Sequence, residues 1–417
     1  MRLIGLVSHD ALIAESGNPV SQVILRSLAK KNIDSVLLAD IPISVSRFSR
    51  YCKEQILVPS MATEKEYARA VEKVVKKIKF NIFFPVFEWS LIPVSKNREK
   101  IGAYVKLPIA SHESILACFD KSSTMKLAVE NGIPIPKTYF VGDHSELLKI
   151  SNEITYPAVV KPKWSIMWEK DRAFHRRCGY VNSGAELVRT YESIHQYFPH
   201  PFIQEYVPGT NYSVAALYNE GKPRAFCCIR VQRAWPASGG NSCFRESVHL
   251  DPEMKRHAET LLKNLNWHGI AEVEFRVDSR DGIPKLMEIN PRFWGSLEVA
   301  VRSGVDFPYL LYRIAMDGDV NTVSSYKVGV KGRYAAQDIL YIVSLFTDAS
   351  TNPAIRIPKR FRTLLRWLRI YEPEVFYDLL NLDDPLPFLF TLGLSPLDVA
   401  SFLRQERHAW SPPGVRF

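Results

Sequence analysis

The sequence has few of the features that mark secreted, zinc-binding or membrane-spanning proteins. Its six cysteines include no C-x-x-C pair and are scattered over 417 residues, which fits neither a zinc cluster nor a disulfide framework. No segment supplies about 18 uncharged apolar residues in a row, and the apolar run before Ser8 is too short for the core of an export signal. These absences predict reduced thiols and a cytoplasmic protein.

Acidic residues are in deficit, with 44 Asp and Glu against 54 Lys and Arg, and the net charge is +10 at pH 7. This excess favours an anionic partner: a nucleotide, a phosphorylated or carboxylate substrate, nucleic acid, or an acidic membrane surface. The basic residues are spread along the chain, and no motif typical of nucleic-acid-binding domains occurs. We therefore expect no nucleic-acid partner.

The first third lacks the glycine-rich turn of a dinucleotide-binding fold, although its order of elements is similar. Apolar runs at 3–8, 34–40 and 81–87 predict buried strands, and Asn18 and Pro19 form a typical start of the helix that follows the first run. Alternating strands and helices predict βαβ units with a parallel sheet. Because no G-x-G-x-x-G follows the first predicted strand, we discount a nicotinamide cofactor.

The region from about 120 to 320 predicts an α+β unit. Asp120 can cap a helix that ends before Gly132, and a strand ends at Lys161, which precedes a proline. Pro-Gly and Asn-Glu-Gly turns separate the later apolar runs, which indicates antiparallel hairpins.

Two alternating runs around Asp281 predict a β-hairpin with an unusual polar face. If the hairpin is centred on Asp281, Glu274 lies opposite Glu288 and Glu272 lies opposite Asn290. Like charges in direct opposition destabilise a strand pair, and a divalent cation between them removes that cost. Carboxylate, carboxamide and phosphate oxygens are ligands that Mg²⁺ accepts. The alternative is a solvated polar face on a half-exposed sheet.

Five short motifs in this order resemble the ATP-grasp superfamily. They are DK at 120–121, VVKP at 159–162, IQEYVPG at 203–209, VEF at 273–275 and MEINPR at 287–292. The sequence is most similar to carboxylate-amine ligases whose ATP-binding domain is like that of carbamoyl-phosphate synthase. The resemblance covers roughly residues 1 to 320.

The resemblance implies an α/β and α+β fold in three parts. A Rossmann-like pre-ATP-grasp domain is expected at 1–118 and an ATP-grasp domain at 119–325, with two α+β subdomains that meet near residue 205. Residues 326–417 are expected to form a mainly helical C-terminal extension, because amphipathic patterns with Pro-rich joints fill this region.

By this resemblance, the nucleotide lies between the two subdomains of the ATP-grasp domain. Lys121 and Lys161 match residues that contact ATP phosphates, although a lysine at the surface end of a strand is the commoner case. Main-chain groups of the linker bind the adenine edge in the family, which implicates Gln204, Glu205, Tyr206 and Val207. Asn211 falls where many members have a ribose-binding Glu, so the ribose contact is weaker or made differently; a turn residue is the alternative.

Glu274, Glu288 and Asn290 match the metal ligands of the family, which implies Mg²⁺, with Mn²⁺ as a substitute. Arg292 matches an arginine that stabilises the transferring phosphoryl group and the acyl-phosphate intermediate. Glu272 is interpreted as a solvent-side carboxylate.

A basic segment with a flexible Ser-Gly-Gly lies over the reacting carboxylate in similar sequences. Arg230 and Arg245 flank this segment, so either can orient the acceptor acid through a bidentate contact.

One departure from the family concerns the loop at 163–180, which has no glycine before Gly179. Family members close a Gly-rich loop over the phosphates through main-chain amides. Here the loop is basic and aromatic instead, with Trp164, Trp168, Arg172, His175, Arg176 and Arg177. It can cover the γ-phosphate with side chains or bind an acidic substrate; an ordinary lid with solvated arginines is the alternative.

Residues 359–370 form a basic amphipathic pattern in which five Lys and Arg alternate with apolar side chains. Such a helix can lie on an anionic membrane or fit a partner groove. We favour packing of its apolar stripe on its own domain. The Pro-bounded apolar stretch at 381–390 can cover the ATP-grasp domain or a homodimer partner.

The predicted function is ATP-dependent ligation of a small-molecule carboxylate to an amine or ammonia, through an acyl phosphate. The alternative is a non-catalytic nucleotide-sensing or peripheral-membrane ATP-binding protein, which the missing Gly-rich loop favours. The identity of the acid and the amine depends on loops that have no transferable code.

Overall fold

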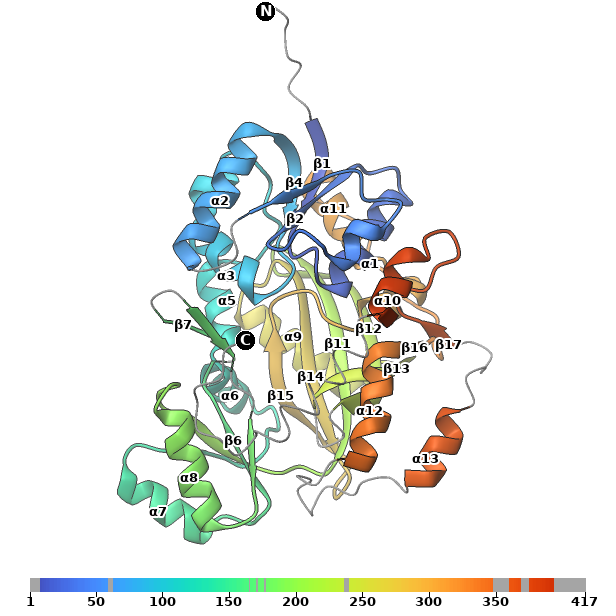
Figure 1. Ribbon diagram of the computed structural model, residues 1–417. Coiled ribbons are helices and arrows are strands. Elements are labelled where there is room, and N and C mark those ends of the chain that lie inside the picture. Colours follow the sequence, from blue (N-terminus) through green and yellow to red (C-terminus); the bar gives the residue numbers. More distant parts are fainter. Residues whose placement is uncertain are drawn as a thin grey trace, which may run out of the picture.

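The computed structural model describes residues 8–58, 63–164, 166–169, 172–175, 178–235, 240–347, 360–368 and 375–393. Three larger sheets organise these residues, and helices cover them (Figure 1). The mixed α/β architecture confirms the predicted fold class for the first 320 residues. The predicted domain limits stay a prediction.

A parallel sheet in the order β3-β2-β1-β4 forms the N-terminal unit, at the top of Figure 1. Its strands are β1 (Ser8–Ile13), β2 (Ser35–Ala39), β3 (Gln55–Leu57) and β4 (Lys79–Phe84), and its helices include α1 (Pro19–Ala29) and α2 (Glu64–Lys77). Asn18 caps α1 as predicted, because its side chain accepts a hydrogen bond from the amide of Val20.

The first strand lies later in the sequence than predicted. Of the predicted strand at 3–8, only Ser8 lies within the described residues, and the strand continues to Ile13, five residues beyond its predicted end. His9 and Asp10 begin it with polar side chains, which pair with Asp34 and Asn81. This polar start concealed the strand, whereas Ala11 to Ile13 are fully buried. The connection from β1 to α1, residues 14–18, contains a single glycine, Gly17.

Four helices connect the N-terminal sheet to the rest of the chain: α3 (Glu88–Lys96), α4 (Arg98–Gly102), α5 (His112–Phe119) and α6 (Lys121–Glu130). Asp120 caps α6 as predicted, since its carboxylate accepts hydrogen bonds from the amides of Ser122 and Ser123. Lys121 is therefore fixed at the first position of a capped helix.

A small antiparallel sheet in the order β5-β10-β6-β9 lies at the lower left of Figure 1. Its strands are β5 (Thr138–Phe140), β6 (Ala158–Lys161), β9 (Gly179–Val181) and β10 (Phe202–Glu205), and α7 (His144–Glu153) and α8 (Gly184–His195) pack on it. Between β6 and β9, the strands β7 (Ile166–Glu169) and β8 (Arg172–His175) pair as a separate hairpin.

The large sheet in the centre has the order β15-β14-β11-β12-β13-β16-β17. Its strands are β11 (Gly209–Asn219), β12 (Lys222–Trp235), β13 (Asn241–Val248), β14 (Gly269–Asp278), β15 (Pro284–Asn290), β16 (Lys331–Arg333) and β17 (Val375–Tyr377). Because side chains alternate along a strand, its two faces enter different cores. Ala215 and Leu217 pack with the N-terminal unit, α10 (Leu297–Arg302) and α11 (Phe307–Asp317), whereas Val214 and Ala216 pack with α5, α6 and α9 (Pro252–Asn264).

The C-terminal region combines α12 (Ala335–Thr347) and α13 (Arg360–Trp367) with β16 and β17, two strands that we did not predict. Each has only three residues, which is too short for a periodic signal. Residues 348–359, 369–374 and 394–417 lie outside the described ranges, so a mainly helical extension stays a prediction.

The stretch at 381–390 contacts the N-terminal unit. Asp384 accepts hydrogen bonds from Gln22, Arg26 and Ser49, and the ring of Phe390 stacks on Phe48 with centroids 4.3 Å apart. The prediction that this stretch covers the ATP-grasp domain or a homodimer partner did not include this contact with the N-terminal unit, and both alternatives stay predictions.

Candidate functional site

The β14–β15 hairpin has the predicted register, with Glu274 opposite Glu288 and Glu272 opposite Asn290. The amide nitrogen of Asn290 donates hydrogen bonds to Glu272 (3.0 Å) and to Glu274 (2.9 Å). Both glutamates are thus held against one carboxamide. Three carboxylates on one sheet face form an acidic surface that attracts a cation.

Glu272 is not the solvent-side carboxylate that we predicted, because it is only 5% exposed. Burial and the neighbouring Glu274 raise the pKa of Glu272 to about 8. The prediction failed because strand alternation shows which face a residue lies on, and not whether another unit covers that face. Here the charge of Arg292 acts on Glu272, and Arg292 itself pairs with Glu88 at the start of α3.

Arg292 follows β15 and pairs with Glu88, the first residue of α3, at 2.8 Å. Its guanidinium also lies 4.5 Å from the centre of the Phe87 ring. Sequence analysis missed Glu88. Its signal was an acidic residue just beyond the carboxyl end of a parallel strand, β4, where open α/β sheets bind ligands.

Lys121 and Lys161 bring buried positive charge beside this acidic face. The ammonium group of Lys121 contacts the carboxylate of Glu288 and so joins α6 to β15. Burial lowers the pKa of Lys121, and burial lowers the pKa of Lys161 to about 8, with the charge of Lys121 acting in the same direction. Among the described residues Lys161 has no ion-pair partner. An anion placed between these two ammonium groups relieves their desolvation and repulsion.

The predicted adenine linker connects β10 of the small sheet to β11 of the large one. The amide of Glu205 donates to the carbonyl of Lys137 (2.9 Å), and the amide of Tyr206 donates to the carbonyl of Pro157 (3.2 Å). Val207 is 3% exposed, and its amide has no hydrogen-bond partner in the described part of the chain. A buried unpaired amide is unusual and suits a ligand that supplies an acceptor.

The other two nucleotide candidates are Gln204 and Asn211, whose side chains differ in their hydrogen bonds. The amide nitrogen of Gln204 donates to the hydroxyl of Thr138 at 2.9 Å. Asn211 pairs with Arg276 across β11 and β14, and its side-chain oxygen is buried without a partner among the described residues. A ribose hydroxyl can donate to that oxygen.

Arg230 and Arg245 have different surroundings. Arg230 lies on β12, pairs with Glu246 at 2.7 Å and has a side chain that is 40% exposed. Arg245 on β13 is 1% exposed, contacts Asp378 and donates to the carbonyl of Gly295 at 2.9 Å. Arg230 is thus accessible to a substrate, whereas Arg245 holds the segment that follows Arg292. Substrate contact by either arginine stays a prediction.

Glu274, Glu288 and Asn290 can hold a metal ion only if a bound ligand supplies further oxygen atoms. In the described ranges, no group of three or more His, Cys, Asp and Glu side chains is placed to hold a metal by itself. Two carboxylates and one carboxamide oxygen leave room for phosphate oxygens, which is how proteins commonly hold Mg²⁺.

The loop at 163–180 forms the β7–β8 hairpin in the middle of its length. The structure does not describe the side chains predicted to face the phosphates or an acidic substrate, those of Trp168, Arg172, His175, Arg176 and Arg177. Cys178, at the end of this loop, is near enough to Lys121 and Lys161 to influence their pKa values.

Comparison with known proteins finds a family model that matches the part of the chain containing the β14–β15 hairpin. A family model described as "ATP-grasp in the biosynthetic pathway with Ter operon" matches residues 197–337. The carbamoyl phosphate synthase large chain of Pyrococcus furiosus is 25% identical over 58% of this chain and 22% of its own length. The D-aspartate ligase of Enterococcus faecium is 22% identical over 48% of this chain and 50% of its own length. This chain therefore spans half or less of these two relatives.

Solved structures with the same fold cover more of the chain. Biotin carboxylase from Campylobacter jejuni superposes with a TM-score of 0.61 over 78% of this chain and 74% of its own, at 15% identity. An L-amino acid ligase from Bacillus licheniformis superposes with a TM-score of 0.56 over 74% of each chain, at 17% identity. These similarities show the fold.

Proposed function

The chain contains an ATP-grasp domain, and from this premise we propose that it is an ATP-dependent ligase that joins a carboxylate to an amine or ammonia. The main support is the convergence of charge at the candidate site. Glu274, Glu288 and Asn290 of one hairpin lie beside two buried lysines from α6 and β6. Mg-ATP complements such a pair of surfaces, because its cation matches the acidic face and its phosphates match the lysines.

In the proposed reaction, a carboxylate oxygen attacks the γ-phosphorus, and the bond from this phosphorus to the β–γ bridging oxygen breaks and releases ADP. The amine nitrogen then attacks the acyl carbon, phosphate leaves, and the nitrogen loses a proton. Lys121 and Lys161 bind phosphate oxygens, and Arg292 stabilises the charge on the transferring phosphoryl group. The unpaired amide of Val207 donates to the adenine edge. When bound, Mg²⁺ or Mn²⁺ neutralises phosphate charge at Glu274, Glu288 and Asn290.

Amino acids are the proposed substrate class. The relatives include D-aspartate ligase and D-alanine–D-alanine ligases, whose names give amino acids as substrates. Arg230 is the accessible guanidinium for an acceptor carboxylate, since its side chain is 40% exposed. Six unpaired cysteines and a reaction that consumes ATP suit a cytoplasmic setting.

An ADP-release screen with pools of amino acids and small carboxylates tests this function. We expect amine-dependent ADP release with at least one pool, and trapping of the acyl phosphate as a hydroxamate when hydroxylamine replaces the amine. Glu288→Ala should abolish both signals. Binding of Mg-ATP without ADP release in any pool would favour a nucleotide sensor instead.

Peripheral membrane contact is a second proposal, supported by the exposed side of α13. Leu364 and Trp367 pack toward Tyr341 and Leu345, which agrees with the interpretation we favoured for this helix. Phe361 and Leu365, however, are 76% and 67% exposed. The sequence at 354–371 contains six Lys and Arg and no acidic residue, so an anionic lipid surface complements the charge of this segment. No helix in the described ranges is long and apolar enough to cross a bilayer.

A further inference from the structure

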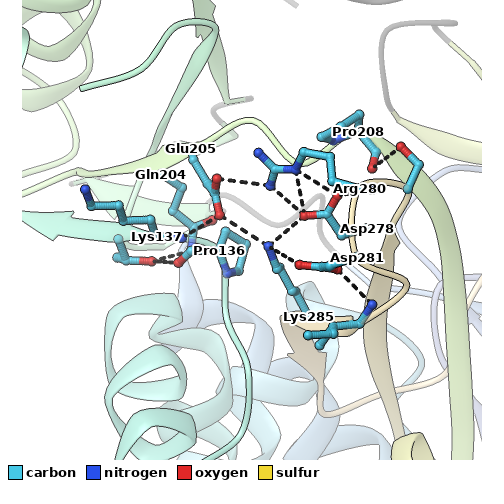
Figure 2. Close-up of polar contacts among 12 residues, drawn as sticks. Pro136, Lys137, Gln204, Glu205, Pro208, Asp278, Arg280, Asp281 and Lys285 are labelled. Carbon is cyan, nitrogen blue, oxygen red and sulfur yellow. Dashed lines mark hydrogen bonds and ion pairs between the residues drawn. The ribbon is translucent and has the colours of Figure 1, made fainter.

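A network of charged side chains lies at the turn of the β14–β15 hairpin, at the opposite end from the metal candidates. Figure 2 shows that Arg280 and Lys285 from the hairpin reach Glu205, the last residue of β10, and that Asp278 contacts both of these basic side chains. Arg280 lies 3.1 Å and Lys285 3.5 Å from the Glu205 carboxylate. The network therefore joins the small sheet to the large sheet across the linker.

Asp278 is the buried centre of this network, with no exposed surface. It accepts hydrogen bonds from the guanidinium of Arg280 (2.5 Å) and the ammonium of Lys285 (2.6 Å). These contacts hold the pKa of Asp278 well below its usual range, with the Arg280 hydrogen bond as the largest cause. Arg280 and Lys285 are thus fixed in the direction of Glu205, and the cost of ordering two long side chains is already met within the hairpin.

The linker at 205–209 is attached to the same turn at both of its ends. At its start, the Glu205 carboxylate contacts Arg280 and also accepts from the amide of Lys137 at 3.0 Å. At its end, the amide of Ser279 donates to the carbonyl of Pro208 at 2.8 Å. A Cβ added at Gly209 would lie 1.9 Å from the carbonyl oxygen of Val277, so only glycine permits this close approach.

The same two strands carry the metal candidates: Glu274 precedes Asp278 on β14, and Glu288 follows Lys285 on β15. We infer that Arg280 and Lys285 are positioning residues, which hold the adenine-binding linker at a fixed distance from the phosphate-binding end of the site. They act through Glu205 and do not touch the nucleotide. This inference rests on the proposed nucleotide site, and it adds a determinant of affinity and base selectivity that lies outside the site.

The inference separates two roles for the network. A network that only stabilises the hairpin turn affects the unfolding of the protein and leaves nucleotide affinity unchanged. A network that positions the linker changes the affinity for ATP and the discrimination between ATP and GTP, because main-chain groups of the linker meet the base edge. Preorganised supports of this kind act on binding geometry.

Glu205→Gln is the most informative variant. Glutamine keeps the shape and the oxygen that accepts from Lys137, but it removes the charge that Arg280 and Lys285 contact. Asp319→Asn is the matched control, because Asp319 pairs with Arg224 of the same large sheet through two contacts of 2.6 Å, away from the linker. The measurements are equilibrium binding of Mg-ATP and Mg-GTP, and thermal unfolding without nucleotide.

We expect Glu205→Gln to weaken Mg-ATP binding by about fivefold or more, with a smaller loss for Mg-GTP. Arg280→Gln should give an equal or smaller loss, because the Lys285 contact with Glu205 remains, and the double variant should be no worse than Glu205→Gln alone, which already removes the contact with Arg280. The control should bind both nucleotides as the wild type does. The midpoints of thermal unfolding of Glu205→Gln and Asp319→Asn should fall below that of the wild type by similar amounts.

Two results are decisive against the inference. If the wild type binds Mg-ATP and Glu205→Gln binds it equally well, the network has no positioning role, whereas the proposed function stands. If the wild type binds no Mg-ATP, the proposed function and the inference fail together.

Discussion

At the scale of single residues, the candidate site buries basic and acidic side chains that lack a full set of oppositely charged partners. Lys161 has no ion-pair partner among the described residues, while Glu272 and Glu274 share one carboxamide. Each arrangement costs stability in the free protein, since a buried charge without a counter-charge is disfavoured. Perturbed pKa values of this kind gather at functional sites. The bound ligand therefore has a direct energetic effect on these groups.

Lys161 should take up a proton when ATP binds at mildly alkaline pH. Burial lowers the pKa of Lys161 to about 8, so part of the population is neutral at pH 8.5 in the free protein. Phosphate oxygens favour the charged form and raise this pKa again. Calorimetry at pH 8.5 in buffers of different ionisation enthalpy should report an uptake of about half a proton or more, which Lys161→Met reduces. Equal uptake in both proteins would contradict this assignment.

Glu272 should make the free protein less stable as the pH rises. Because burial and Glu274 raise the pKa of Glu272 from 4.5 to about 8, the folded state binds more protons than the unfolded state in this window, and stability falls between these pH values. Glu272→Gln should remove that loss. The variant should exceed the wild type by about 1 kcal/mol or more in urea unfolding at pH 8, and match it near pH 4.5. A constant difference across this range would show that titration of Glu272 is not the cause.

At the scale of elements, the features predicted from the sequence are those that depend on residues close together in the chain. The cap of α6 by Asp120 and the Glu274–Glu288 register follow from capping residues and from a turn between alternating runs. Burial of Glu272 and the partner of Arg292 did not follow, because both depend on contacts between segments that are far apart in the sequence. Glu88 lies 204 positions from Arg292 in the sequence, and no local pattern links them.

The exposed side of α13 should bind anionic vesicles. Phe361 and Leu365 can enter the headgroup region while neighbouring basic residues meet lipid phosphates. We expect co-sedimentation with phosphatidylserine vesicles at low salt, little with phosphatidylcholine vesicles, and a large decrease in the Phe361→Ser, Leu365→Ser double variant. Leu382→Ser is the control, since Leu382 is 92% exposed outside this helix. No binding by the wild type, or concentration-dependent dimerisation that the double variant abolishes, would contradict membrane contact.

At the scale of the whole molecule, the C-terminal segment ties the N-terminal unit to the large sheet. Asp378 contacts Arg245 of β13, and six residues later Asp384 pairs with Arg26 of α1 at 2.9 Å. The Asp384 side chain is 1% exposed, and it also accepts from Gln22, Ser49 and the amide of Arg50. The contacts of Asp384 were not predictable, because the sequence at 381–390 shows only a Pro-bounded apolar pattern that can pack on many surfaces.

Asp384→Ala should destabilise the protein by about 3 to 5 kcal/mol, because it leaves the buried Arg26 charge and three other donors without their partner. Asp317→Ala, which breaks the exposed pair with Arg313, should cost less than about 1 kcal/mol. Urea unfolding of both variants measures the difference. Equal losses would mean that Asp384 does not tie the two units together.

Mg²⁺-dependent binding of ATP tests most directly the central claim, that one hairpin and two buried lysines form a Mg-ATP site. The comparison is titration of ATP into the wild type and into Glu288→Gln, with Mg²⁺ and with a chelator, and with Asp319→Asn as the control. The account predicts that Mg²⁺ increases the affinity of the wild type and the control for ATP by about tenfold or more, and that Glu288→Gln loses this increase. Equal ATP affinity with and without Mg²⁺ in the wild type, or an unchanged Mg²⁺ effect in Glu288→Gln, would contradict it.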